Sequence, residues 1–279
     1  MKNKTFTLVP IGGLGNRLNA IASAIVYCKN TNRNLQIIWF KDPGLNCCYH
    51  KLFSIRSCFP WVNIRNATFM DFILRDNPRK KNLRLPTLFQ YFIFDKCIYE
   101  SDVYDVVSAK TKPDYGNIDV FDRIFMVIYC SFWVSPDMWN FFDLSPEVLH
   151  RVEEQTSAFT PDTIGLHIRR TDNMYSINQS PTELFEHKIT EEIEKNSHVN
   201  FYLASDSLEE KSRLINKFGC KIITSTEKAE RNTEKGIVDA FVEMNILSRT
   251  KIIYATAKSS FSELASFLTN IPFVELIKE

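Results

Sequence analysis

One stretch decides the fold of the second half of the chain: Ile164-Gly165-Leu166-His167-Ile168-Arg169-Arg170-Thr171-Asp172-Asn173. Its first part is short, apolar and β-branched, which predicts a buried strand over residues 164–169. Two adjacent arginines and an aspartate follow. Ligands of open parallel sheets bind outside the carboxyl ends of the strands, and two guanidinium groups there suit a diphosphate. The alternative is that the arginines pair with surface carboxylates.

The composition is that of an ordinary globular protein. The chain has 279 residues, 44% of them hydrophobic, which suffices for one large domain or two small ones. The net charge of +1 excludes a strong overall attraction to nucleic acid, so any anion site is local. The seven cysteines show no Cys-x-x-Cys and no zinc spacing. Because neither a signal peptide nor an apolar run of membrane-spanning length is found, we expect reduced thiols and a cytoplasmic protein.

A glycine-rich turn marks the amino-terminal part of the chain. A strand over residues 5–9, the turn Gly12-Gly13-Leu14-Gly15-Asn16-Arg17, a helix over 21–31 and a strand over 35–40 form a β–α–β unit. The turn lacks the dinucleotide fingerprint and the P-loop signature. Its glycines permit close approach of the backbone to a ligand, and polar groups at a helix start favour anions. A tight turn that requires small residues is the alternative.

Strands and helices alternate regularly after residue 164. Strands are expected at 164–169, 201–205, 221–224, 251–255 and 273–277, and helices at 182–195, 208–218, 236–248 and 263–268. This alternation predicts a parallel, doubly wound sheet. Together with the first unit it predicts an α/β fold of two Rossmann-like domains facing a cleft, the GT-B architecture, with domains 1–160 and 161–279. Residues 42–159 are rich in aromatics and give a poor pattern, apart from a helix from Ser145 to about residue 157.

Further polar residues follow the other predicted strands. Asp206 follows one strand, and Ser259, Ser260 and Ser262 open a helix after another. Because the carboxyl ends of parallel strands lie at one edge, we expect these groups near the arginine pair. Hydroxyl and amide groups at a helix start form an anion site, although simple N-capping also explains the serines.

Two carboxylates lie four residues apart on a predicted helix. Asp239 and Glu243 therefore share a face, which either contacts solvent or presents an acceptor pair to a guanine edge. The sequence contains no Asp-x-Asp, the motif that commonly holds a divalent metal in enzymes that use sugar nucleotides. We therefore expect arginine to neutralise a departing diphosphate.

The segment from His167 to Asp172 resembles the His-x-Arg-Arg-x-Asp motif of the α1,2-, α1,6- and protein O-fucosyltransferase superfamily. Residues 202–207, 237–248, 251–256 and 259–262 resemble its later motifs in order and spacing, and the glycine-rich turn resembles its Gly-Gly-x-Gly-Asn start. The resemblance implies a GT-B fold, GDP-fucose as the donor, no metal or other cofactor, and inversion at the anomeric carbon.

The resemblance also implies roles for individual residues. Arg169 and Asp172 are expected to be catalytic, Arg169 by stabilising the leaving β-phosphate. The nucleotide-sugar site comprises His167, Arg170, Asp206, Glu243, Ser259, Ser260, Phe261 and Ser262. The amino-terminal domain contributes Gly13, Gly15, Asn16 and Arg17. Asn173 and Ile177 stand where some α1,6 enzymes have lysine and glutamate, so the general base stays open between Asp172 and Glu183.

These observations together predict a bacterial, inverting, metal-independent fucosyltransferase. Its acceptor is expected to be an oligosaccharide or a lipid-linked glycan, and nucleic acid is not an expected partner. It is expected in the cytoplasm, with peripheral association with the inner membrane face left open. Two alternatives stay open: the same fold using another GDP-sugar, and a non-catalytic protein that binds a nucleotide or a glycan. The basic run over residues 76–84 is expected to be a solvated loop.

Overall fold

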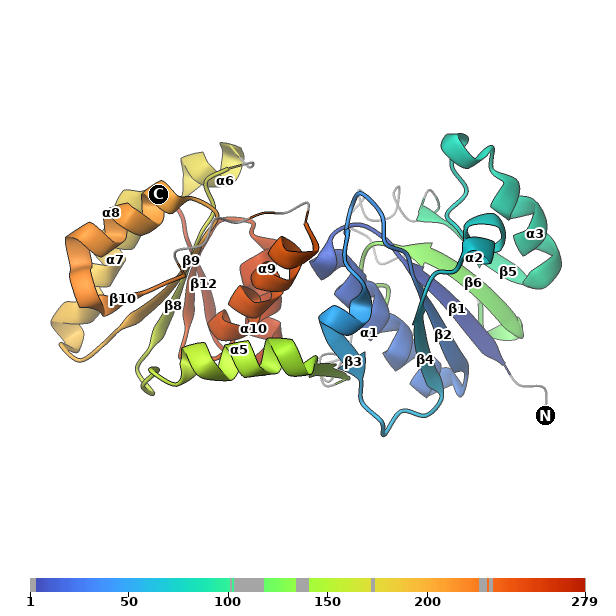
Figure 1. Ribbon diagram of the computed structural model, residues 1–279, viewed down its shortest axis with the longest axis horizontal. Helices are drawn as coiled ribbons and strands as arrows, with labels where there is room; N and C mark the ends of the chain where they lie inside the picture. Colours follow the sequence, from blue (N-terminus) through green and yellow to red (C-terminus); the bar gives the residue numbers. More distant parts are fainter. Residues whose placement is uncertain are drawn as a thin grey trace. The chain divides into compact units, whose positions relative to one another are not determined.

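The structure, a computed structural model, describes residues 4–100, 102, 118–133, 141–171, 174–225, 230 and 233–278. The chain divides into two compact α/β units, Met1–Ser145 and Pro146–Glu279 (Figure 1). The boundary expected from the sequence lies after residue 160. The division falls earlier because helix α5 (Pro146–Thr156) packs against α9 (Glu234–Leu247), where the Arg151 guanidinium lies 2.6 Å from Asp239 Oδ1.

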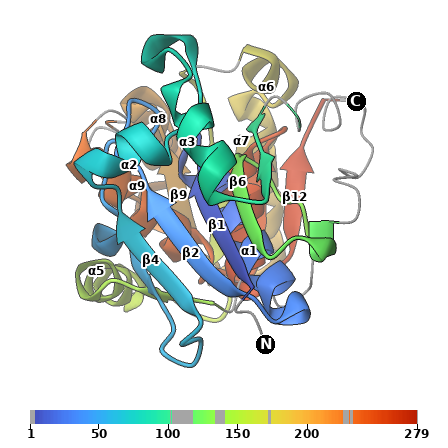
Figure 2. The same cartoon turned by 90° about the vertical axis from the view of Figure 1, so that its right-hand side faces the viewer.

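The first unit is built on a five-stranded sheet of order β4-β2-β1-β6-β5, in which every pair is parallel. Its strands are β1 (Thr5–Pro10), β2 (Asn34–Trp39), β4 (Val62–Asn66), β5 (Lys96–Ile98) and β6 (Arg123–Ile128). Strands β3 (Phe53–Ile55) and β7 (Phe142–Leu144) form a separate antiparallel pair. Helix α1 (Leu14–Thr31) packs against β1 and β2, and α2 (Phe69–Leu74) lies beside α3 (Leu85–Ile93) (Figure 2).

Helix α1 begins at Leu14, earlier than the expected residue 21. Gly13 is the N-cap, in an extended conformation, so the second half of the glycine-rich turn is already helical. Gly12 has a φ of +83°, and a Cβ there would lie 2.8 Å from Asn16 Nδ2. The turn therefore needs glycine at position 12 for its backbone conformation, whereas the Asn16 side chain is flexible at its end.

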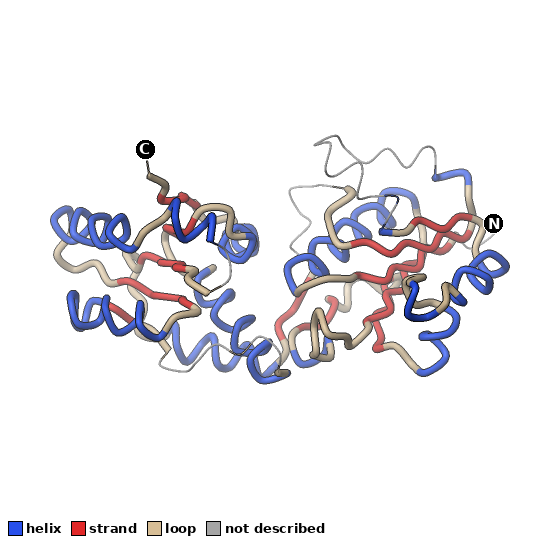
Figure 3. The backbone as a smooth tube through the Cα atoms, turned by 90° about the horizontal axis from the view of Figure 1, so that it is seen from above, coloured by secondary structure: helices blue, strands red, loops and turns tan. Residues whose placement is uncertain are grey.

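The second unit contains a five-stranded parallel sheet of order β10-β9-β8-β11-β12. Its strands are β8 (Ile164–Ile168), β9 (Phe201–Ser205), β10 (Ile222–Ile223), β11 (Ile253–Thr256) and β12 (Phe273–Leu276). Its other helices are α6 (Met174–Gln179), α7 (Thr182–Lys195), α8 (Leu208–Phe218) and α10 (Ser260–Thr269). Helices flank the strands on both faces (Figure 3), which confirms the predicted doubly wound arrangement.

Strand β8 is buried along its whole length and uses its two faces differently. On one face Leu166 packs with Phe185 of α7 and Leu214 of α8. On the other, a Cβ at Gly165 would lie 2.7 Å from Thr250 Oγ1 and 3.1 Å from a methyl carbon of Leu247. Glycine at this position therefore lets the end of α9 and the residues after it approach the sheet closely.

Candidate functional site

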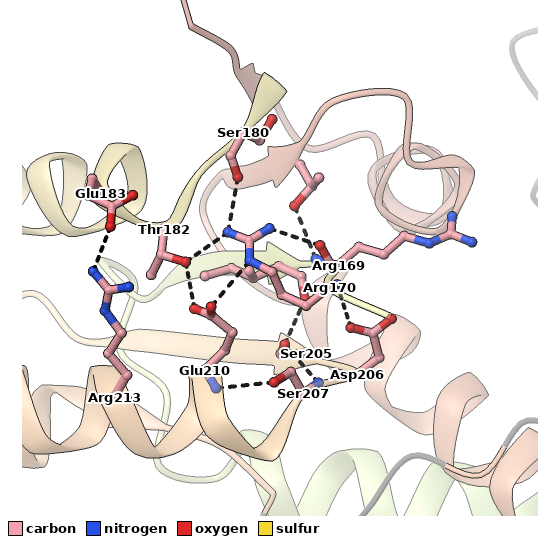
Figure 4. Close-up of polar contacts among 12 residues, drawn as sticks. Arg169, Arg170, Ser180, Thr182, Glu183, Ser205, Asp206, Ser207, Glu210 and Arg213 are labelled. Atoms are coloured by element: carbon pink, nitrogen blue, oxygen red, sulfur yellow. Dashed lines mark hydrogen bonds and ion pairs between the residues drawn. The ribbon is translucent and has the colours of Figure 1, made fainter. Parts of the chain in front are cut away.

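The polar residues at the carboxyl edge of the second sheet are joined by hydrogen bonds. The Arg169 amide donates to Thr256 Oγ1 (3.1 Å), at the end of β11. The Arg170 amide donates to Asp206 Oδ1 (2.7 Å), which follows β9. Ser205 Oγ donates to the carbonyl of Ile168 (2.7 Å). The ends of three strands are thus tied together, as expected, and the backbone that carries the arginine pair is fixed (Figure 4).

The Arg170 guanidinium is bound within the protein. Its side chain is only 10% exposed, and Nε lies 3.3 Å from Glu210 Oε1. One terminal nitrogen donates to the Ser180 carbonyl and to Thr182 Oγ1, both at 3.0 Å. The other donates to the Arg169 carbonyl (2.8 Å). Arg170 therefore links the loop after β8 to the starts of α7 and α8. It supports the site from within and, unlike the expected diphosphate-binding pair, does not offer its guanidinium to a phosphate.

The Arg169 side chain extends in the opposite direction, away from the group around Arg170 (Figure 4). Only part of its surface is buried. Its backbone is fixed on both sides, by Thr256 at its amide and by Arg170 at its carbonyl. A long cationic side chain on a fixed backbone at a sheet edge is suited to binding an anion.

His167 and two serines form one hydrogen-bonded group at the start of α10. The Nδ1 atom of His167 lies 3.1 Å from Ser262 Oγ and 3.2 Å from Ser259 Oγ. Both serines are buried, and the Phe261 ring stacks on the imidazole at a centroid distance of 4.8 Å. Ser259 is the N-cap residue, but its side chain makes no capping hydrogen bond. Simple capping therefore does not explain Ser259, and Ser260 is the exposed hydroxyl of this cluster.

Asp206 orients the loop that follows β8. Besides the Arg170 amide, it accepts a hydrogen bond from Thr171 Oγ1 (2.6 Å) at its second oxygen. Both carboxylate oxygens thus contact the segment that leads into Asp172. Asp172 itself, expected to be catalytic, and Asn173 lie outside the described residues.

Glu183, the other candidate base, is bound by Arg213. An Arg213 terminal nitrogen lies 2.9 Å from Glu183 Oε1 (Figure 4). This hydrogen bond lowers the pKa of Glu183, which makes the carboxylate a weaker base. Glu183 is therefore an exposed carboxylate in an ion pair with Arg213.

The two carboxylates on α9 have different partners. Asp239 pairs with Arg151 of α5, whereas Glu243 Oε1 lies 3.3 Å from Nζ of the buried Lys211 on α8. Lys211 also donates to the Ser225 carbonyl (3.0 Å). Burial raises the pKa of Glu243, and the positive charge of Lys211 opposes that rise. Neither residue forms the purely solvated helix face that was the alternative, and Glu243 is a largely buried carboxylate held by one lysine.

The expectation that Arg17 offers its guanidinium to a ligand is wrong. Its side chain is fully buried, and Nε donates to the Gly12 carbonyl (2.8 Å). One terminal nitrogen donates to the Phe40 carbonyl (2.5 Å), and the other lies 2.9 Å from Asp42 Oδ1. Arg17 therefore fastens the glycine-rich turn to the segment after β2. Burial lowers the pKa of its guanidinium.

The remaining candidates of the first unit lie at the start of α1. Gly13 and Asn16 are exposed, and Gly15 is partly exposed. The backbone groups here and the Asn16 amide are accessible to a ligand, whereas the Arg17 guanidinium is buried.

Several supporting residues were not identified from the sequence. They are Ser180, Thr182, Glu210 and Thr256, which hold the arginine pair in place. Thr256 had a detectable signal, because it directly follows the strand expected at 251–255, at the same edge. The other three are brought to Arg170 only by tertiary packing.

Within the described parts of the chain, no group of three or more His, Cys, Asp or Glu side chains is arranged to hold a metal ion. None of the described helices is both long enough and apolar enough to span a membrane.

No protein-family model and no curated protein sequence matches the chain, but solved structures do. NodZ α-1,6-fucosyltransferase soaked with GDP-fucose matches with a TM-score of 0.67 at 17% identity, over 98% of this chain and 95% of that one. NodZ from Bradyrhizobium gives 0.66 at 18%, over 99% and 96%. POFUT1 in complex with GDP-fucose gives 0.59 at 10%, over 100% and 99%. The chain therefore has the α/β, GT-B-like fold of these fucosyltransferases over essentially its whole length.

Proposed function

We propose that the protein transfers fucose from GDP-fucose to a hydroxyl of a glycan acceptor, with inversion and without a metal ion. One observation carries this proposal. The Arg169–Arg170 pair stands at the carboxyl edge of the second sheet, in a fold shared with NodZ, whose crystals were soaked with GDP-fucose, and with POFUT1, solved in complex with GDP-fucose.

The proposed chemistry rests on Arg169. When the bond between the sugar and the β-phosphate breaks, negative charge grows on the departing GDP. A guanidinium bound to the β-phosphate stabilises this charge more in the transition state than in the ground state. Arg170, Asp206 and Thr256 keep the Arg169 backbone in place and so position this group.

The acceptor hydroxyl attacks the anomeric carbon from the face opposite the leaving GDP, which inverts the configuration there. The hydroxyl proton passes to a base. The candidates for this base are Asp172 and Glu183, of which Glu183 pairs with Arg213. A transition state with oxocarbenium character reduces the demand on this base.

The proposed nucleotide contacts lie on α9 and α10. Glu243 accepts hydrogen bonds from N1–H and N2–H of guanine, with Lys211 holding the carboxylate in place. Ser260 and the amide groups at the start of α10 contact the phosphates, since a helix start favours anions. His167, Ser259, Phe261 and Ser262 support this helix start from within the fold.

The proposal also covers the acceptor and the location of the enzyme. We propose an oligosaccharide or a lipid-linked glycan as the acceptor, and GDP-fucose as a donor substrate with no cofactor. We place the enzyme in the cytoplasm, in peripheral contact with the inner face of the membrane.

A thermal-shift panel of GDP, UDP, ADP, CMP and NAD tests the nucleotide, followed by incubation with GDP-fucose and an oligosaccharide acceptor. A ligand at 100 times its dissociation constant stabilises by about 2.7 kcal/mol, and we expect this for GDP alone. We also expect GDP release that persists in EDTA. Equal stabilisation by UDP would refute the proposal that GDP-fucose is the donor. GDP binding without turnover would instead indicate a non-catalytic protein, and activity that requires manganese would refute the metal-free mechanism.

A further inference from the structure

Helix α3 presents its apolar side to solvent. The exposed residues Leu85, Leu88, Phe89 and Phe92 follow a helical repeat and form one face, with Tyr91 beside it. Leu88, Tyr91 and Phe92 are 58%, 78% and 73% exposed, whereas Gln90 is completely buried. This is the reverse of an ordinary surface helix, which buries its apolar side and exposes its polar side.

Helix α2, which lies beside α3 (Figure 2), has the same reversed arrangement. Its Asp71 is completely buried, whereas Phe69 and Met70 are 78% and 53% exposed. Arg65 donates to both oxygens of the Asp71 carboxylate, at 2.6 and 2.8 Å, and Thr68 Oγ1 donates to one of them at 2.7 Å. The buried charge is therefore fully compensated.

The buried polar groups fix the orientation of both helices. Gln90 Nε2 donates to the Asp76 carbonyl (2.9 Å), and Gln90 Oε1 accepts from the Tyr99 hydroxyl (2.8 Å). Turning α3 to bury its phenylalanines would leave these groups without partners, at a cost comparable to a lost buried hydrogen bond. The apolar exposure is thus built into the fold.

The connection between the two helices ends in a projecting apolar residue. Leu83 and Arg84 both adopt left-handed backbone conformations, with φ of 51° and 55°. The Asn82 side-chain oxygen accepts from the Arg79 and Arg84 amides, at 2.8 and 3.2 Å, and holds this unfavourable turn. Leu83 is 81% exposed as a result.

The exposed charges of this region are all positive. Lys80, Lys81 and Arg84 are exposed, and residues 69–93 contain only two carboxylates. Asp71 is buried, and Asp76 accepts hydrogen bonds from the Asn77 amide and Asn82 Nδ2. We define the α2–α3 surface as Phe69, Met70, Phe72, Leu83, Leu85, Leu88, Phe89, Tyr91 and Phe92 together with Lys80, Lys81 and Arg84.

We propose that the α2–α3 surface docks on an anionic phospholipid bilayer. Apolar helix faces flanked by basic side chains bind at the boundary between headgroups and acyl chains, and the positive charges attract anionic lipids. A second copy of the chain fits less well. A twofold dimer through this surface would bring two identical cationic clusters together, and like charges facing each other are unfavourable.

Flotation with vesicles of phosphatidylcholine, with and without phosphatidylglycerol, tests the proposal with the full chain. The wild type should float with the anionic vesicles. Each basic side chain contributes a factor of about five to affinity, from about 1 kcal/mol. Lys80→Gln, Lys81→Gln and Arg84→Gln combined should therefore weaken binding about a hundredfold. The matched control combines Lys29→Gln, Lys51→Gln and Lys278→Gln, which removes the same charge at exposed positions outside the surface and should keep binding.

A second variant separates docking from folding. Leu88→Ser with Phe92→Ser should abolish flotation without lowering the melting temperature, because both side chains are exposed. The proposal is overturned if the wild type fails to float, or if either surface variant floats as the wild type does. A dimer in analytical ultracentrifugation that this variant dissociates, without vesicle binding by the wild type, would instead assign the surface to a second copy. None of these readouts depends on fucosyl transfer.

Discussion

Each unit of the chain places arginine at the junction between a strand and the segment that follows it, and the two junctions use it differently. After β1, the Arg17 guanidinium turns inward and binds two carbonyls and Asp42. After β8, Arg170 is bound in the same internal manner, but Arg169 extends away from it. Carboxylates and carbonyls within the protein therefore hold the Arg17 and Arg170 guanidinium groups, whereas the Arg169 side chain extends away from the group that holds Arg170.

The largest effect should come from Arg17→Ala. It removes a buried cation, leaves the Gly12 and Phe40 carbonyls without this donor and leaves Asp42 without its cationic partner. Breaking a buried pair costs about 3–5 kcal/mol. We expect that loss in the free energy of unfolding, measured by denaturant titration. Asn16→Ala, the exposed neighbour, should change it by less than about 0.5 kcal/mol. A stable Arg17→Ala protein with impaired GDP binding would restore the ligand role that the structure contradicts.

Arg169→Ala should instead affect the rate. Losing one preorganised donor to a developing charge costs about 10²–10³ in rate, roughly 2.7–4 kcal/mol. We expect kcat to fall at least about a hundredfold while the melting temperature stays near that of the wild type. Arg169→Lys should not restore the rate, because a point charge does not replace the planar fork. An unchanged kcat with a lower melting temperature would make Arg169 structural, as Arg17 is.

Arg170→Lys should give a smaller, mixed effect. Lysine can keep the ion pair with Glu210 but cannot also reach Ser180 and Thr182 in the fork geometry of arginine. Hydrogen bonds to charged groups contribute about 1.5–3 kcal/mol, so we expect a loss of that order in the free energy of unfolding. Because Arg170 positions Arg169, kcat should fall as well. A fall in kcat without any loss of stability would indicate a direct contact with the substrate.

The second unit was predictable because its local signals agree with its packing. Helices α7 and α8 and strand β9 have the bounds expected from the sequence. In α8, for example, Ser207 is the N-cap and its hydroxyl accepts from the Glu210 amide (3.3 Å). Buried apolar strands alternate there with amphipathic helices, so hydrophobic periodicity indicates the elements correctly.

The first unit was less predictable because burial and polarity disagree in it. Asp71 and Gln90 face inward while phenylalanines face outward, so the periodicity of α2 and α3 points to the wrong side. The sequence predicts that the site residues gather at the ends of the strands. It does not predict that Arg170 is bound within the protein while Arg169 extends away from it. The partners of Arg170 include Glu210, which lies 40 positions away in the sequence. No local sequence pattern predicts which of the two arginines will pair with so distant a carboxylate.

The smallest expected effect is the selectivity of the protein for GDP over UDP. In the proposed nucleotide site, Glu243 would accept from two guanine donors that uracil and adenine cannot supply in the same arrangement. We therefore expect GDP to bind at least about tenfold more tightly than UDP, or about 1.4 kcal/mol. Glu243→Gln keeps the shape but replaces one acceptor with a donor, and should remove this difference. The ratio of the two affinities is the informative quantity, because any general loss of stability affects both ligands equally.

The difference between GDP and UDP affinity should depend on pH. Burial raises the pKa of Glu243 in the free protein, whereas guanine donors favour the ionised carboxylate and lower the pKa in the complex. GDP affinity should therefore be complete above the raised pKa and fall as the pH decreases through it, by at most about tenfold per pH unit. The ratio of GDP to UDP affinity, measured by calorimetry, should decrease at a pH above the ordinary glutamate value of about 4.3. Phosphate ionisation cancels in this ratio, and Glu243→Gln should show no such decrease. A ratio that stays constant with pH in the wild type would mean that Glu243 serves only as the partner of Lys211.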